Sequence, residues 1–306
     1  MRQTATAFAP GSVGNVGPGL DILGLAVRGA GDEVTLTRAS GSEILVEEAG
    51  HPDIPADPLR HASAIAARAV FMRLRYSGGA VLRLRKGLPL SGGQGGSAAS
   101  AVAGAVAANH LIDGGLDDNA LLECALVAES AVAGRHADNL APSLLGGLVL
   151  VRSLDPVSVL KLPVPASLRI VLVHPAQQLR TRDARGVLPD SVPRDVALAQ
   201  ATRIAEMVAG AYADDVTMFG RAIDDRIAEP VRAPLLPGFV PAKQAAIDAG
   251  ALGCSISGAG PTSFAVVAND AAAEEVASAM KGAYAASGIA STVRITTPDL
   301  DGATVR

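Results

Sequence analysis

The spacing of apolar and polar residues changes several times along the first half of the chain, between a period of two and a period of about 3.6 residues. This predicts strands and helices in mixed order. Short alternating or continuously apolar runs are typical of strands, and longer runs with a period of about 3.6 residues are typical of helices. The predicted strands are 4–9, 32–37, 44–48, 80–85, 148–151 and 157–162, and the predicted helices are 61–75, 97–111, 117–130 and one that starts near residue 138. Residues 9–21, rich in glycine and proline, are expected to form a loop.

The second half of the chain begins with a continuously apolar strand and ends in a strand–helix–strand pattern. The predicted strands are 169–174, 254–257, 262–267 and 291–296, and the predicted helices are 194–210, 214–226, 243–250 and 271–286. Two prolines in residues 163–167 indicate a joint between domains. Strands and helices mixed in this order predict an α+β fold rather than a regular parallel sheet.

The composition is that of a globular protein and argues against several classes. The 306 residues are 49% hydrophobic and 18% charged, which suffices for a sizeable core. A net charge of -4, scattered arginines and the absence of tryptophan argue against nucleic acid as a partner. The most apolar stretch, 98–112, is shorter than the ~18 residues of a membrane span, and no targeting signal is visible. With Cys124 and Cys254 lacking any metal-ligand spacing, we expect a cytoplasmic protein with reduced, buried thiols and no membrane partner.

Residues 86–100 form a glycine-rich segment between a predicted strand and a predicted helix. Glycines let backbone N–H groups approach a ligand, and the first turn of a helix adds unpaired N–H groups and a positive dipole end. This arrangement predicts an anion site, most plausibly for nucleotide phosphates. A Walker loop is excluded because Gly93 occupies the lysine position, and a dinucleotide fingerprint through Gly93, Gly95 and Ala98 has no second strand to carry Asp113 to a ribose. A plain glycine-rich connector remains the alternative.

Polar residues elsewhere admit both a chemical and a structural role. Turn formation alone explains Asn15 and Asp21 in the Gly/Pro-rich loop. Glu129 ends an apolar helix, where the helix dipole disfavours a carboxylate, and this favours a functional role. Taken singly, His136 is a surface histidine and Asp138 is a helix N-cap.

The glycine-rich segment resembles the phosphate-binding motif of the GHMP kinases, P-x-x-x-G-L-G-S-S-A. The matching residues are Pro89, Gly93, Gly95, Ser97 and Ala98, and the departures are Gln94 for leucine and Gly96 for the first serine. Residues 255–264 are similar to a further motif of this family, S-G-S/A-G-P-T. Residues 9–21, 136–142, 181–189 and 227–239 are similar to the segments that distinguish the homoserine kinases within it.

This resemblance implies an α+β, two-domain GHMP kinase fold, with a ribosomal-S5-domain-2-like ATP-binding domain over 1–165 and a ferredoxin-like C-terminal domain over 166–306. It implies that ATP and Mg²⁺ serve to phosphorylate the hydroxyl of L-homoserine, a step toward threonine, in the cleft between the domains. The implied ATP-binding residues are Pro89, Leu90, Ser91, Gly92, Gly93, Gln94, Gly95, Gly96, Ser97, Ala98 and Ala99.

The resemblance also assigns roles to the other polar residues. Ser97 and Glu129 are the implied Mg²⁺ ligands, and they are catalytic together with Asn139, which orients the substrate hydroxyl. The implied substrate-binding residues are Asn15, Asp21 and His136 for the ammonium group, Thr181, Arg185 and Arg232 for the carboxylate, and Asn139 near the hydroxyl. A guanidinium group donates two parallel hydrogen bonds to a carboxylate, which suits the two arginines, although either one alone is explained by solvation.

Several questions stay open at this point. Asp138 as a catalytic base is the rival to a mechanism in which Asn139 only orients the hydroxyl. The adenine contacts are not located, although Pro58 and His61 lie in the neighbourhood. Another small-molecule GHMP kinase, for mevalonate or shikimate, and a non-catalytic nucleotide-binding relative are the alternative functions. The sequence does not decide between a monomer and a homodimer.

Overall fold

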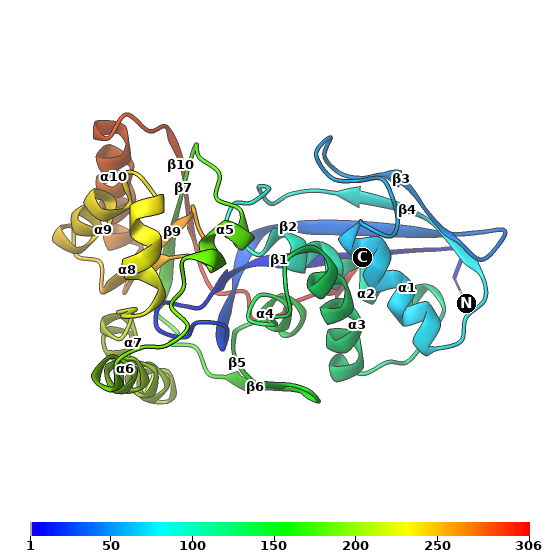
Figure 1. Ribbon diagram of the computed structural model, residues 1–306, viewed down its shortest axis with the longest axis horizontal. Helices are drawn as coiled ribbons and strands as arrows, with labels where there is room; N and C mark the ends of the chain where they lie inside the picture. Colours follow the sequence, from blue (N-terminus) through cyan, green and yellow to red (C-terminus); the bar gives the residue numbers. More distant parts are fainter. Residues whose placement is uncertain (1) are drawn as a thin grey trace.

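The computed structural model describes residues 2–306 and contains two β-sheets with helices packed on them (Figure 1). In the larger sheet β11, β1, β2, β4 and β3 follow one another, and β5 and β6 attach through β2. These strands are β1 (Thr4–Gly14), β2 (Leu23–Ala39), β3 (Ile44–Glu48), β4 (Gly79–Arg85), β5 (Leu148–Leu154), β6 (Val157–Leu162) and β11 (Thr304–Val305).

The smaller sheet is antiparallel and belongs to the second half of the chain. Its order is β10–β7–β9–β8. These strands are β7 (Arg169–Pro175), β8 (Gly253–Ile256), β9 (Ser263–Val267) and β10 (Ser291–Thr296). The chain end then returns to the larger sheet, where β11 pairs with β1 through Ala7 and Val305.

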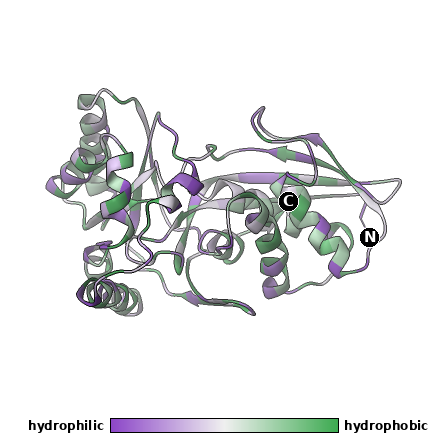
Figure 2. Ribbon diagram, viewed as in Figure 1, coloured by the Kyte–Doolittle hydropathy of each residue, from purple (hydrophilic) through white to green (hydrophobic). Residues whose placement is uncertain are grey.

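The helices fall into two groups at opposite ends of the molecule (Figure 1). The first group is α1 (Ala62–Arg73), α2 (Gly96–Leu111), α3 (Asp118–Val132) and α4 (Leu140–Leu145). The second group is α6 (Arg194–Tyr212), α7 (Val216–Arg221), α8 (Ala228–Arg232), the 3-10 turn η1 (Ala233–Leu235), α9 (Phe239–Asp248) and α10 (Asp270–Ala286). The short α5 (Thr181–Gly186) lies between the groups and is mostly hydrophilic (Figure 2). The predicted α+β class is confirmed.

Helix α2 lies in the centre of the larger core. It contacts β1 and β2 on one side and α1 and α3 on the other. Its alanines, such as Ala101 and Ala105, are fully buried because small side chains allow close approach on every face. Gly104 lies so close to Ser63 of α1 that a Cβ atom would not fit. The uninterrupted apolar stretch in the sequence therefore reflects a helix enclosed by protein.

The predicted loop 9–21 is wrong over its first part, and the predicted strand 32–37 is too short. The pairing of β1 with β2 continues beyond a register shift at Pro10/Gly11 and ends with Gly14 opposite Gly24. Both strands extend through glycine-rich sequence because the neighbouring strand satisfies their backbone groups. The tight turn therefore begins only at Asn15.

One predicted helix in the second half, 214–226, is confirmed over α7 (Val216–Arg221) but is wrong beyond Arg221. Helix α7 ends at Arg221, and the carboxylate of Asp225 accepts hydrogen bonds from the backbone N–H groups of residues 227–229. Asp225 thus starts α8 instead of continuing α7. The pattern does not predict α5, α8 or β11, because such short elements carry too few residues for a periodic signal.

The prediction of buried, free thiols is confirmed. Cys124 and Cys254 are free and buried, and burial raises the pKa of the Cys254 thiol to about 12. Within residues 2–306, none of the helices combines the length and the apolar character that crossing a membrane requires.

Candidate active site

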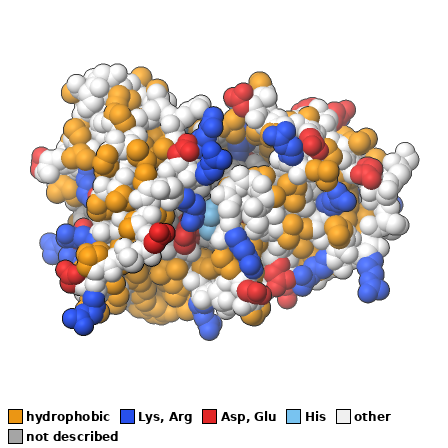
Figure 3. All heavy atoms as spheres, in the orientation of Figure 1, with side chains coloured by type: hydrophobic (Ala, Val, Ile, Leu, Met, Phe, Trp, Pro, Cys, Tyr) orange, Lys and Arg blue, Asp and Glu red, His pale blue; other side chains and the backbone are white. Residues whose placement is uncertain are grey.

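Both halves of the chain contribute to a cavity of about 760 Å³. Its wall includes the end of β4, the start of α2, the turn after β1, helix α5 and residues 258–260. In Figure 3 this region is a hollow with lysine and arginine side chains around it and with acidic groups and a histidine inside. The cavity therefore joins segments that are far apart in the sequence.

The glycine-rich segment forms one side of this cavity. Gly93 and Gly95 have left-handed backbone angles, with φ of 73° and 68°, which glycine adopts without strain. Helix α2 starts at Gly96, so its first turn, with unpaired N–H groups, opens at the cavity. The residues of the predicted ATP set that line the cavity are Pro89, Leu90, Ser91, Gly92, Gly93, Gly95, Gly96 and Ser97.

Three residues of the predicted ATP set do not line the cavity. Ala98 and Ala99 are fully buried in the core around α2. Gln94 is nearly buried, and its side chain binds Thr262 and Arg294 on the side of the smaller sheet. The side chains of these three residues hold the loop in place rather than facing the cavity.

Beneath the loop lies a buried ion pair that the sequence analysis did not identify. Lys86 Nζ binds the carboxylate of Asp32 and also donates to Gly96 O at 2.7 Å and to Ser100 Oγ at 3.2 Å. The other oxygen of Asp32 accepts hydrogen bonds from the backbone N–H groups of residues 87–88. All three ammonium protons thus have acceptors, and the pair anchors the loop at both ends.

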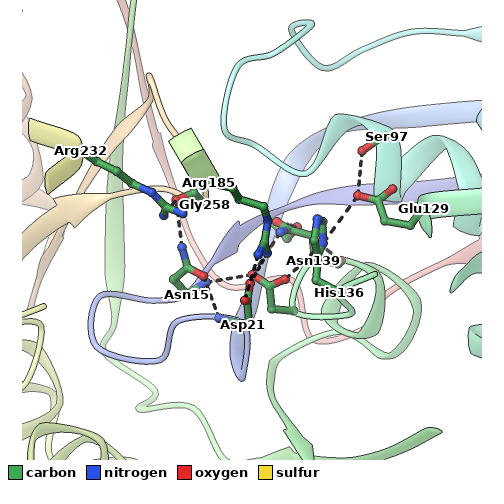
Figure 4. A network of polar contacts seen from close by, with 11 residues as sticks. Asn15, Asp21, Ser97, Glu129, His136, Asn139, Arg185, Arg232 and Gly258 are labelled. Atoms are coloured by element: carbon green, nitrogen blue, oxygen red, sulfur yellow. Dashed lines mark hydrogen bonds and ion pairs between the residues drawn. The ribbon is translucent and has the colours of Figure 1, made fainter. Parts of the chain in front are cut away.

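Glu129, Ser97 and His136 form a polar group on the cavity wall (Figure 4). Ser97 Oγ donates to Glu129 Oε1 at 3.0 Å, whereas the buried Glu129 Oε2 has no hydrogen-bond partner within residues 2–306. Burial raises the pKa of Glu129 to about 7, against the opposing effect of His136. His136 Nδ1 lies 3.9 Å from Glu129 Oε1, and neither ring nitrogen has a hydrogen-bond partner among the described residues. Buried unsatisfied groups of this kind are candidates to bind a ligand.

Ser12 of β1 and Asn15 of the turn after it hold Asp138 and Asn139 near Glu129, Ser97 and His136. Asp138 Oδ2 accepts from Asn15 N and from Asn139 Nδ2, both at 3.2 Å. Asn139 Oδ1 accepts from Ser12 Oγ at 2.9 Å. Burial raises the pKa of Asp138, an effect that His136 opposes. Gly14 is required here, because a Cβ atom would lie 2.5 Å from Asn139 Nδ2 and 2.6 Å from Asp138 Oδ2.

The side chain of Asn15 makes two hydrogen bonds within the protein. Its Nδ2 donates to Gly258 O at 2.9 Å, and its Oδ1 accepts from Asp21 N at 3.1 Å. Asn15 therefore ties the turn after β1 to residue 258 and fixes the backbone of Asp21. Although it lines the cavity, it acts as a connector in this structure.

Asp21 and Arg185, predicted to bind opposite ends of the substrate, form an ion pair with each other. Arg185 donates to both carboxylate oxygens of Asp21, with Nη1 3.2 Å from Oδ2 (Figure 4). The two side chains remain about a third exposed, at 33% for Arg185 and 40% for Asp21. Their charges compensate each other at the edge of the cavity.

Arg232 and Thr181 also line the cavity. Arg232 is nearly buried and donates to Ala184 O and Gly258 O, both at 3.1 Å. Burial lowers the pKa of Arg232, and the nearby Arg185 adds to this effect. Arg232 therefore braces α5, the helix that carries Arg185.

A further part of the cavity wall was not predicted, except for His61, which was named near the adenine contacts. It consists of residues from the connection between β3 and α1 and from β4, namely Asp53, Ile54, Pro55, Arg60, His61 and Leu84. His61 is buried, its Nδ1 has no hydrogen-bond partner among the described residues, and burial lowers its pKa. Pro58 lies outside this wall. The connection has no motif or period, so its sequence carries no signal for this role.

Comparisons with known proteins agree with the family resemblance in the sequence. Residues 61–147 match the model of the GHMP kinase N-terminal domain, and residues 207–286 match that of the GHMP kinase C-terminal domain. Homoserine kinase from Chlorobaculum tepidum is 41% identical over 92% of this chain and 91% of its own length. The enzyme from Arabidopsis thaliana is 40% identical over 90% of this chain and 77% of its own length. The crystal structure of homoserine kinase from Cytophaga hutchinsonii has a TM-score of 0.95 and 40% identity, and it covers 100% of this chain and 98% of its own.

Proposed function

The chain belongs to the GHMP kinase family, and we propose that it transfers the γ-phosphoryl group of ATP to the side-chain hydroxyl of L-homoserine. GHMP kinases use ATP as the phosphate donor, and the relatives compared above are homoserine kinases. We also propose residues 1–165 as the ATP-binding domain and 166–306 as the C-terminal domain, with the active site between them.

The phosphate-binding role rests on the loop at residues 89–97. Its backbone N–H groups and the positive end of α2 suit the triphosphate, and the buried Lys86–Asp32 pair keeps the loop in place. Phosphoryl transfer depends mainly on positioning and on neutralising charge. A loop that the protein already holds by hydrogen bonds before ATP binds fits that demand.

Ser97 and Glu129 are two oxygen ligands, which is about the number that a protein contributes to a Mg²⁺ ion bound with ATP. Glu129 Oε2 is buried without a hydrogen-bond partner among the described residues, so a cation would supply the missing interaction. No larger cluster of His, Cys, Asp or Glu suited to a metal occurs within residues 2–306. This agrees with Mg²⁺, which takes most of its ligands from phosphate and water. When bound, Mg²⁺ neutralises charge on the phosphate oxygens.

The Asp21–Arg185 ion pair is the observation that carries the substrate assignment. An alcohol with both an ammonium and a carboxylate group can separate this pair and offer each member a partner of opposite charge. Mevalonate and shikimate have only the carboxylate, and galactose has neither charge. Mevalonate or shikimate bound to Arg185 would leave Asp21 without its cation, and an unpaired charge in a partly buried site is costly. Galactose offers no charged partner to Asp21 or to Arg185.

We assign to Asn139 the orientation of the attacking hydroxyl. Its amide is held by Ser12 and Asp138, which fixes its direction. The hydroxyl oxygen forms a bond to the γ-phosphorus, the bond between that phosphorus and the bridging oxygen breaks, and ADP leaves. The hydroxyl proton passes to an oxygen of the transferred phosphoryl group and from there to water. A strong base is not obligatory when bond formation lags behind bond breaking.

An ADP-release assay with ATP and Mg²⁺ tests the proposal. We expect turnover with L-homoserine and not with mevalonate, shikimate or galactose. Two matched analogues isolate each charge: 4-hydroxybutyrate lacks the ammonium group, and 3-amino-1-propanol lacks the carboxylate. For each analogue kcat/KM should fall about 100-fold, because leaving one charged group unpaired costs about 3 kcal/mol. Turnover of mevalonate would refute the substrate assignment, and ATP binding without any turnover would indicate a binding protein.

A further inference from the structure

The carbonyl groups of residues 92–94 in the phosphate loop are each held by a group outside the cavity wall. Thr262 Oγ1 donates to Gly92 O at 2.5 Å, and Ser257 Oγ donates to Gly93 O at 2.6 Å. The next carbonyl, of Gln94, accepts from Ser12 N at 3.1 Å. In a trans peptide the C=O and the following N–H point in opposite directions. The N–H groups of residues 93–95 therefore point away from these anchors, and Gly93 and Gly95 line the cavity.

The side chain of Gln94 also binds two groups outside the cavity wall. Its Nε2 donates to Thr262 Oγ1 at 3.3 Å, and its Oε1 accepts from Arg294 Nη2 at 3.1 Å. Gln94 is nearly buried, so both contacts are shielded from solvent. The leucine usual at this position of the family motif makes neither contact.

Arg294 belongs to β10 of the smaller sheet and contacts the larger sheet as well. Its Nη1 donates to Arg28 O in β2 at 3.1 Å. Within residues 2–306 no carboxylate lies at ion-pair distance from Arg294, and burial lowers its pKa. A partly buried cation whose side-chain contacts are two neutral oxygens depends strongly on each of them. Loss of the Gln94 contact therefore affects both the loop and the cation.

We propose that Arg294 is a positioning residue for the phosphate loop and acts through Gln94. With Thr262 and Ser257, it fixes the peptide planes of residues 92–95 from the side of the smaller sheet. This inference rests on the proposed function, since it takes the loop to bind the phosphates of ATP. It assigns to β10, far from the loop in sequence, a share of the ATP affinity.

A double-mutant cycle of Gln94→Leu and Arg294→Met tests the proposal. Each single variant should raise the KM for ATP about 10-fold, since a hydrogen bond to a charged group is worth about 1.5 kcal/mol. The KM for L-homoserine should change less than about twofold. The KM for ATP of the double variant should also stay near 10-fold above the wild-type value instead of 100-fold, because both changes break the same Gln94–Arg294 hydrogen bond, through which the effect on the loop passes. Arg169→Met is the matched control, because Arg169 lies on the same sheet, in β7, pairs with Asp270 of α10 and makes no hydrogen bond to the loop.

Direct titration of ATP by calorimetry separates this inference from the proposed function. If the wild-type protein binds ATP without turning over homoserine, the dissociation constants of the variants must show the same pattern. An unchanged affinity for ATP in both single variants would overturn the inference, as would additive effects in the double variant. A wild-type protein that does not bind ATP would overturn both proposals. Thermal unfolding of each variant excludes loss of folded protein as the cause of a shift.

Discussion

Replacement of Glu129 by glutamine should stabilise the protein in the absence of ligands and do so more strongly as the pH rises. Glu129 is buried, and this burial raises its pKa from 4.5 to about 7. The ionised carboxylate is thus less favourable in the folded state than in the unfolded chain. Glutamine removes the charge and keeps an oxygen that accepts the hydrogen bond from Ser97.

The size of the effect follows from the two pKa values. Below pH 4.5 the carboxyl group is protonated in both states and costs nothing. Between pH 4.5 and 7 the unfolded chain ionises while the folded protein does not, so the wild-type protein loses about 1.4 kcal/mol of unfolding free energy per pH unit. Above pH 7 the loss is constant at about 3 kcal/mol. The glutamine variant lacks this loss.

Urea unfolding of both proteins without Mg²⁺ or nucleotide, at pH 5 and pH 8, measures the difference. The variant should exceed the wild-type protein by less than about 1 kcal/mol at pH 5 and by about 3 kcal/mol at pH 8. Its turnover should be at least about 100-fold lower, because the ligand that we propose for Mg²⁺, worth about 3 kcal/mol, is lost. A stability difference that is the same at both pH values, or a variant less stable at pH 8, would refute the reasoning.

Other predictions concern the surroundings of the cavity. Asp32→Ala leaves Lys86 buried without its carboxylate and should lower the unfolding free energy by about 3–5 kcal/mol in urea at pH 7.5; a loss below about 1 kcal/mol would contradict an anchoring role. Gly14→Ala forces a Cβ atom against Asn139 and should reduce kcat about 100-fold with little change in the KM for ATP, while unchanged kcat would show that Asn139 can move freely. Asp138→Asn retains an acceptor for Asn15 N and should lower kcat only about 10-fold; a fall of about 10²–10⁴-fold with folding intact would identify Asp138 as the general base.

Much of the site follows from local patterns in the sequence. The phosphate loop was predictable because glycines followed by an apolar helix start have few other uses, and the structure opens the first turn of α2 at the cavity as expected. The place of Glu129 at a helix end, unfavourable for a carboxylate, indicated a functional role, and the structure puts this residue on the cavity wall. The finer contacts were not predictable. From the sequence, for instance, Asn15 could be a substrate ligand or a turn residue. Only the structure shows that its hydrogen bonds connect the turn after β1 to Gly258 and to Asp21.

By itself the sequence determined the class of fold, most helix and strand positions and the family, because periodicity and glycine motifs are properties of neighbouring residues. The tertiary structure decided which charged side chains form ion pairs and hydrogen bonds with each other. Asp32 faces Lys86 because β2 and β4 pair with Glu33 opposite Arg85, and such a register depends on the whole sheet. Arg185 meets Asp21, and Arg294 meets Gln94, only after two separate sheets have packed together. Residues so distant in the chain come into contact only in the folded state, so the local sequence pattern does not predict these contacts.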